Sequence, residues 1–214
     1  MIVFFDLDGT LINSKPEIVA TLHEALKICE VNESDQEREF VIGPHLKDLI
    51  PMAFPNGYFS PEKLQEVIQV YRSLYEKSDH EMTKPFPGID HLIKNAPYPT
   101  YLLTNKPYKP AFKIISSYGW DHHLKDIWAS DSSTGESKIT MLRKAKNVFV
   151  SQTIIMVGDT YEDVHAATEN GLYSIGVTYG QGKKEELLSG GAKAIVNSGQ
   201  ELETFLDALN QKNF

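Results

Sequence analysis

Residues 2–10, with the sequence IVFFDLDGT, decide the fold of this chain. The first four residues are β-branched or aromatic, which predicts a fully buried strand, central in a parallel sheet. The run ends in Asp6 and Asp8, two residues apart, so an extended backbone would point both side chains to the same side. Gly9 allows a sharp turn where a Cβ would crowd the chain. We therefore expect two carboxylates at the carboxyl end of a strand, where open α/β sheets place their chemistry.

An Asp-x-Asp pair in this position has three uses. The two carboxylates can hold a hard cation such as Mg2+ through oxygen. They can divide the work of a nucleophile and of an acid/base. They can also do no chemistry and only cap the following helix. The pair alone leaves all three open, and the rest of the chain has to distinguish them.

Length, charge and cysteine content restrict the class of protein. The 214 residues allow one large domain or a core with a smaller insertion. The formal net charge of -8 argues against nucleic acid and against an anionic membrane surface as partners. A single cysteine, Cys29, excludes an internal disulfide. The first strand starts at once and no apolar run is long enough to span a bilayer, so we expect no signal peptide and a cytoplasmic protein.

The periodicity of apolar residues divides the chain into two parts. Residues 15–82 show helical spacing without strand alternation, whereas strand and helix patterns alternate from residue 83 onward. This alternation predicts a parallel sheet with helices on both faces. We expect an α/β doubly wound core, residues 1–14 and 83–214, with an inserted α-helical domain at residues 15–82. The strands expected after the insertion are 99–104, 126–129, 153–159, 173–177 and 194–196.

Polar side chains follow two further strands in the same way as the first. One strand ends in a hydroxyl and an amide, another ends in an acid with a second acid four residues on, and a lysine opens the helix between them. The carboxyl ends of parallel strands meet at one edge of a sheet, and acids with a lysine and a hydroxyl suit a Mg2+-phosphate site. That edge would collect Asp6, Asp8, Thr104, Asn105, Lys138, Asp159 and Asp163.

The order and rough spacing of these residues resemble the four motifs of the haloacid dehalogenase (HAD) superfamily. The motifs are residues 6–10 (DLDGT), Thr104, Lys138 and residues 158–163 (GDTYED). Weaker markers are similar to the phosphoglycolate-phosphatase-like branch with a helical cap: residues 42–44 (IGP), 85–88 (PFPG) and 176–180 (GVTYG). The resemblance implies a Rossmann-like core, with the inserted helices as a cap that closes over the site and sets substrate specificity.

The resemblance also implies a role for each site residue. Asp6 would attack phosphorus and become an aspartyl-phosphate, and Asp8 would protonate the leaving alcohol and then deprotonate the attacking water. Mg2+ would be held by the Asp6 carboxylate, the Asp8 backbone carbonyl and Asp159, with Asp163 supporting the site. The residues implied to bind the phosphoryl group are Thr104, Asn105 and Lys138.

The function implied is a Mg2+-dependent phosphatase of a small phosphorylated metabolite, with phosphoglycolate as the first substrate to test. The dehalogenases of the superfamily lack an acid at the position of Asp8, which favours phosphate chemistry. A 5'-nucleotidase, a sugar-phosphate phosphatase, a sugar phosphomutase and a non-enzymatic phospho-acceptor module stay as alternatives. We expect a monomer or a homodimer that binds neither nucleic acid nor membrane.

Simpler interpretations exist for several of these residues. Lys106 is a rival of Lys138 as the phosphate lysine, because it directly follows Thr104 and Asn105. Thr104 could cap the helix that follows it. The glycines at 180 and 182 are interpreted as turn glycines, since their spacing does not fit a nucleotide-binding loop.

Overall fold

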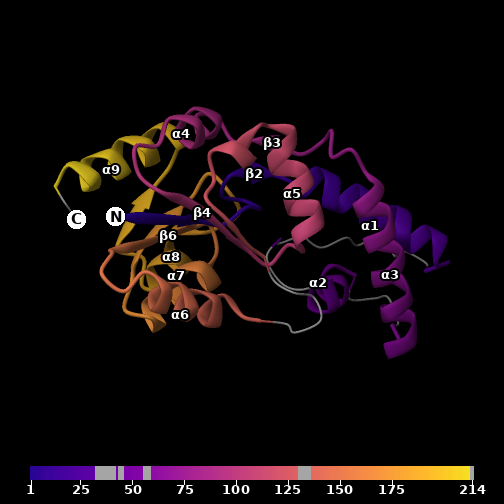
Figure 1. The fold of residues 1–214 in the computed structure, drawn as a ribbon. Helices are drawn as coiled ribbons and strands as arrows, with labels where there is room; N and C mark the ends of the chain where they lie inside the picture. Colours follow the sequence, from indigo (N-terminus) through magenta and orange to yellow (C-terminus); the bar gives the residue numbers. More distant parts are fainter. Residues whose placement is uncertain (32–41, 43–45, 55–58, 130–135, 213–214) are drawn as a thin grey trace. The chain divides into compact units, whose positions relative to one another are not determined.

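The computed structural model describes residues 1–31, 42, 46–54, 59–129 and 136–212 (Figure 1). The chain forms two compact units. The first comprises Met1–Asn13 and Pro85–Phe214, and the second is Ser14–Lys84. No helix in the described ranges is both long and apolar enough to cross a membrane.

A six-stranded, fully parallel sheet forms the centre of the first unit, which confirms the predicted α/β class. The strand order is β5-β4-β1-β6-β7-β8. After β1 the chain adds β4 and β5 on one side of it, and then adds β6, β7 and β8 on the other side. The strand order reverses between β1 and β6, and doubly wound sheets bind their ligands at the carboxyl end of such a reversal. The strands are β1 (Ile2–Phe5), β4 (Thr100–Thr104), β5 (Ile127–Ala129), β6 (Ile154–Gly158), β7 (Tyr173–Val177) and β8 (Ala194–Val196).

Each end of the strands expected after the insertion lies within one residue of its prediction. The sequence did not predict β2 (Ile12–Asn13) and β3 (Lys84–Pro85), which form a separate two-stranded sheet. Two residues are too few for a period of two to be recognised in a sequence.

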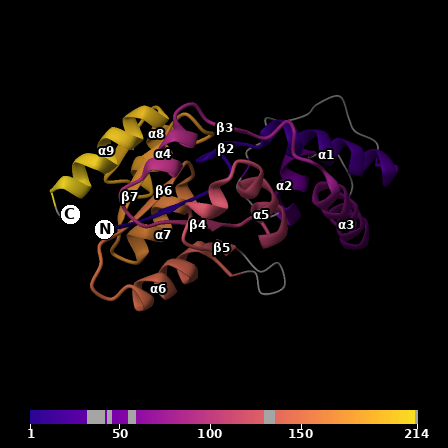
Figure 2. The same ribbon diagram turned by 45° about the horizontal axis from the view of Figure 1, so that its top comes forward.

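Helices cover both faces of the six-stranded sheet (Figures 1 and 2). Val3 and Phe5 of β1 pack with α4, α5 and α9, whereas Ile2 and Phe4 pack with α6 and α7 on the opposite face. The side chains alternate between the two faces because successive residues of a strand point to opposite sides of the sheet. Since helices cover both faces, every residue of β1 is apolar and buried. The helices are α4 (Ile89–Asn95), α5 (Tyr108–Ser117), α6 (Lys138–Val148), α7 (Tyr161–Glu169), α8 (Lys184–Ser189) and α9 (Gly199–Gln211), with a 3-10 turn, η1 (Trp120–His122).

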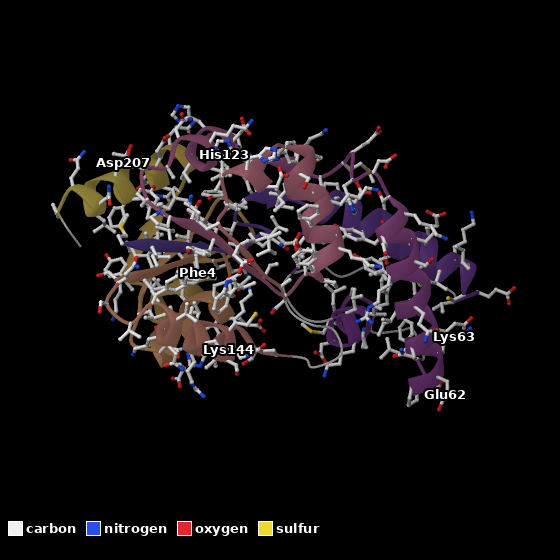
Figure 3. All side chains as sticks on the ribbon, in the orientation of Figure 1. Phe4, Glu62, Lys63, His123, Lys144 and Asp207 are labelled. Atoms are coloured by element: carbon white, nitrogen blue, oxygen red, sulfur yellow. The ribbon has the colours of Figure 1, made fainter. Side chains whose placement is uncertain are left out.

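Phe4, labelled in Figure 3, anchors the face of the sheet that α6 covers. Its ring stacks on Tyr101 at 5.0 Å between centroids and meets the edges of Trp128 at 5.6 Å and Phe149 at 6.2 Å. Tyr101 lies on β4 and Trp128 on β5, so these rings join three adjacent strands. Aromatic pairs of this geometry add to the free energy gained by burial, and they fix β1 between its neighbours.

The second unit is helical in its described part, with α1 (Lys15–Ile28), α2 (Leu46–Ala53) and α3 (Pro61–Lys77) packed around an apolar core of its own. Ser60 caps α3 by accepting a hydrogen bond from the Lys63 N–H at 3.2 Å. The buried Glu17 carboxylate on α1 accepts hydrogen bonds from the Ser78 hydroxyl and, at 3.0 Å, from the Met82 N–H. Residues 43 and 44 of the IGP marker lie outside the described residues.

Candidate active site

The two acids follow the end of β1, and the backbone bends between them before the turn at residues 9–11. The strand ends at Phe5, and the Gly9 N–H donates to the Ile12 carbonyl at 2.8 Å. Gly9 has a φ of +86°, and an added Cβ would lie 2.1 Å from an Asp159 carboxylate oxygen, so the predicted need for glycine is confirmed. The backbone bends at Leu7, between Asp6 and Asp8, so the extended strand that the expectation assumed does not continue to the second acid. Their side chains have different lysine partners.

Lys138 joins the Asp6 carboxylate to that of Asp163. Its Nζ lies 2.8 Å from Asp6 Oδ1 and 2.6 Å from Asp163 Oδ1, and all three side chains are buried. Lys138 is the first residue of α6, which begins there because the Ser137 hydroxyl accepts the Thr140 N–H at 3.3 Å. The cap of α6 therefore places the ammonium group at the ends of β1 and β6.

Asp159 directly follows β6 and is completely buried. Its Oδ1 accepts a hydrogen bond from the Thr10 hydroxyl at 3.1 Å, and its Oδ2 accepts one from the Gln181 N–H at 3.0 Å. Both oxygens therefore have a donor from this chain, each from a different segment. A carboxylate offers about four acceptor positions, so Asp159 keeps capacity to bind a cation.

Asp163 has a structural contact as well as its contact with Lys138. It forms a capping box with Thr160 at the start of α7, in which Asp163 Oδ2 accepts from the Thr160 N–H at 3.0 Å. Thr160 Oγ1 accepts from the Asp163 N–H at 3.4 Å in return. Asp163 therefore stabilises the start of α7 with one oxygen, and its other oxygen contacts the site lysine.

The residues at this edge fit a divalent cation. Carboxylate oxygens of Asp6, Asp159 and Asp163 all lie within 4.8 Å of one another. Oxygen donors are what Mg2+ prefers. Lys138 offsets one of the three negative charges, so the buried group keeps an excess of negative charge that a divalent cation would neutralise. The Asp8 carboxylate is not part of this group.

The pKa values of these groups are shifted first by burial and next by the neighbouring charges. Burial, and next the Asp163 carboxylate, raise the pKa of Asp159 to about 7. Burial also raises the pKa of Asp6 well above its usual value, against the opposing effect of Lys138. Burial alone would lower the pKa of Lys138, but Asp163 and Asp6 raise it, so the lysine stays charged.

Asp8 pairs with the second candidate lysine. Lys106 Nζ lies 3.2 Å from Asp8 Oδ1, and the two side chains are 6% and 14% exposed. The rival lysines therefore have separate positions, Lys138 against Asp6 and Lys106 against Asp8.

Thr104 is the last residue of β4, the strand that pairs with β1. Its Oγ1 accepts a hydrogen bond from the Lys106 N–H at 3.1 Å. The helix that follows, α5, has Pro107 at its N-cap, so the interpretation of Thr104 as a helix cap was wrong. Asn105 lies half-buried between Thr104 and Lys106.

The ion pairs and the close approach of the carboxylates join Asp6, Lys138, Asp159 and Asp163 into one group, and Asp8 with Lys106 into a pair. No site role was predicted for Thr10, Thr160 or Gln181. Thr160 could have been found, because Thr-x-x-Asp before an apolar run is a capping-box signature. Gln181 could not, because its contribution is a backbone N–H.

Comparisons with known proteins show the family to which this chain is similar. A family model described as haloacid dehalogenase-like hydrolase matches residues 3–177. A phosphoglycolate phosphatase of Vibrio cholerae is 28% identical over 200 residues, which cover 87% of this chain and 88% of that protein. A 5'-nucleotidase of Pseudomonas aeruginosa is 29% identical over 192 residues, 86% of each chain. The crystal structure of a predicted phosphatase from Clostridium acetobutylicum is 32% identical, has a TM-score of 0.80, and the match covers 97% of this chain and 98% of that one.

Proposed function

The chain belongs to the haloacid dehalogenase-like hydrolase family, and from this premise we propose that it hydrolyses a small phosphomonoester through an aspartyl-phosphate formed on Asp6. The observation that carries the proposal is the contact of Asp6 with Lys138 inside a buried group of carboxylates at the ends of β1 and β6. A carboxylate nucleophile beside a fixed ammonium and a cation-binding acid set suits attack on phosphorus.

The reaction has two displacements at phosphorus. In the first, an Asp6 carboxylate oxygen bonds to phosphorus, the bond from phosphorus to the alcohol oxygen breaks, and Asp8 gives its proton to the alcohol. In the second, water gives a proton to Asp8 and bonds to phosphorus, and the bond from phosphorus to Asp6 breaks to release phosphate. One acid/base can serve both steps because the first leaves it as the base that the second needs.

The cation would be held by the carboxylates of Asp6 and Asp159 and by the backbone carbonyl of Asp8, with Asp163 supporting the site. When bound, Mg2+ would neutralise charge on the phosphoryl oxygens. Lys138 would hold the Asp6 carboxylate in place and stabilise negative charge on the phosphoryl group during transfer.

Thr104 and Asn105 would bind the phosphoryl group from β4. The Lys106 N–H already donates to Thr104 Oγ1, so this oxygen acts as an acceptor on the protein side. The hydroxyl proton is then oriented away from that donor, which suits donation to a phosphoryl oxygen.

Substrate choice is proposed to lie in the helical unit, residues 15–82, acting as a cap. Phosphoglycolate is the first substrate proposed, because the relative from Vibrio cholerae is named a phosphoglycolate phosphatase. A nucleoside monophosphate is the second, because a relative of nearly equal identity is named a 5'-nucleotidase.

The test is phosphate release from phosphoglycolate, nucleoside monophosphates and hexose phosphates, with Mg2+ and with a chelator. We expect release that needs Mg2+ and that Asp6→Asn abolishes. Asp207→Asn, on α9 (labelled in Figure 3), is the matched control, because it removes a carboxylate outside the site and should keep full activity. The ranking of kcat/KM names the substrate class. A folded chain that releases phosphate from no ester contradicts the proposal and favours the phosphomutase or the phospho-acceptor.

A further inference from the structure

We propose that residues 179–182 (YGQG), which begin two residues after the end of β7, form a positioning loop that holds the Asp159 carboxylate and so sets the affinity of this site for Mg2+. This inference rests on the proposed function, because it concerns the cation that the phosphatase needs. It assigns a role to a segment that the catalytic steps do not use.

The loop contacts Asp159 both directly and through Thr10. The Gln181 N–H donates to Asp159 Oδ2 at 3.0 Å. The Tyr179 hydroxyl donates to the Thr10 backbone carbonyl at 2.9 Å, and the Thr10 hydroxyl in turn donates to Asp159 Oδ1 at 3.1 Å. Each carboxylate oxygen is thus held by one hydrogen bond that depends on this loop, which fixes the rotation of the carboxylate plane.

The two glycines of the loop are required because neighbouring atoms lie too close to leave room for a side chain, and not because of their backbone conformation. Neither has a positive φ. A Cβ on Gly180 would lie 2.0 Å from the Gly9 carbonyl oxygen and 2.7 Å from Asp159 Oδ2. A Cβ on Gly182 would lie 1.7 Å from the Asp159 backbone oxygen. The loop does bend here, but the interpretation as turn glycines missed the main reason for them: any side chain would push the loop off Asp159.

Tyr179 anchors the loop from its other end. Its ring packs edge-on against Phe86, with 5.0 Å between centroids, while its hydroxyl reaches Thr10. Tyr179→Phe therefore removes one hydrogen bond and keeps the apolar contact. This makes it a mild variant that tests positioning without opening a cavity.

A rigid carboxylate matters more for Mg2+ than for Ca2+. Mg2+ requires nearly ideal octahedral geometry with short bonds, whereas Ca2+ accepts a range of distances and coordination numbers. Removing a group that orients a metal ligand typically costs about 10- to 100-fold in metal affinity. We expect Gly180→Ala to weaken Mg2+ binding by about that factor and Ca2+ binding by less, and Tyr179→Phe to act in the same direction with a smaller effect.

The experiment is calorimetric titration of the metal-free, 214-residue chain with Mg2+ and, separately, Ca2+, in the absence of substrate. Asp207→Asn, on α9 and outside the site, is the internal control and should leave both affinities within about 2-fold. Leu206→Val, a buried core residue on α9, controls for a general loss of stability. If Gly180→Ala does not fold, Tyr179→Phe decides the question.

The outcomes separate the inference from the proposed function. A lower ratio of Mg2+ to Ca2+ affinity in Gly180→Ala or Tyr179→Phe, with both controls unchanged, supports the positioning loop. Unchanged metal affinities in variants that only melt at lower temperature overturn it and leave the phosphatase proposal standing. An unaltered chain that binds neither cation overturns the metal site itself, and with it both proposals.

Discussion

Replacing Asp159 by asparagine should remove much of the pH dependence of stability that this chain has without a divalent cation. The Asp159 side chain is completely buried, and burial and Asp163 raise its pKa from 3.8 to about 7. Asparagine has nearly the same shape and keeps an oxygen that can accept the Gln181 N–H, but it carries no charge.

The sign and size follow from proton linkage. Between the unfolded-state pKa of 3.8 and the folded-state pKa of about 7, the folded chain holds a proton on Asp159 that the unfolded chain has released. The contribution of Asp159 to the free energy of unfolding is therefore fully present below the unfolded-state pKa, and it is lost as the pH rises through the folded-state pKa. A shift of about three units at about 1.4 kcal/mol per unit gives a loss of about 4 kcal/mol. This is an upper limit, because the neighbouring carboxylates readjust their protonation when Asp159 ionises.

The assay is the free energy of unfolding in urea, with a chelator present, from about pH 4.5 to about pH 8. The stability of Asp159→Asn relative to the unaltered chain should rise across this range, by at most about 4 kcal/mol. Excess Mg2+ should then raise the stability of the unaltered chain more than that of the variant, because it binds the native carboxylates. Asp207→Asn, on α9, is the control and should not change the slope. Equal pH slopes for the unaltered chain and Asp159→Asn would refute the argument that this buried charge is unfavourable.

Three further changes test the fold and the site. Phe4→Ala removes a ring that packs on three aromatic neighbours, so the free energy of unfolding in urea should fall by about 3–5 kcal/mol. A decrease of less than about 1 kcal/mol would contradict the role of Phe4 as an anchor. Ser60→Ala removes the cap of α3 and should cost about 1 kcal/mol, whereas Ser60→Asp should restore most of it. Lys138→Met leaves Asp6 and Asp163 without their ammonium partner, so kcat should fall by about 100-fold or more. The free energy of unfolding of the metal-free chain should fall by about 3–5 kcal/mol near pH 8. A fully active variant would disprove the phosphate role of Lys138.

Sequence patterns predicted the architecture well because each pattern reports one local property. The β-branched and aromatic run of residues 2–5 predicted a buried strand, and the structure places it inside the sheet, between β4 and β6. Residues 173–177 and 194–196 were predicted to the residue. The two-residue strands β2 and β3 escaped prediction because they have too few residues to show a period.

The sequence by itself determined the fold class, the helical insertion and the set of polar residues that end the strands. These depend on hydrophobic periodicity and on the rule that parallel strands end at one edge. Only the tertiary structure decided which lysine pairs with which aspartate, and that Thr104 accepts the Lys106 N–H and does not cap a helix. It also decided that residues 179–182 pack on Asp159. Such contacts join segments far apart in the chain, and a glycine required by close approach looks in sequence like any glycine in a turn.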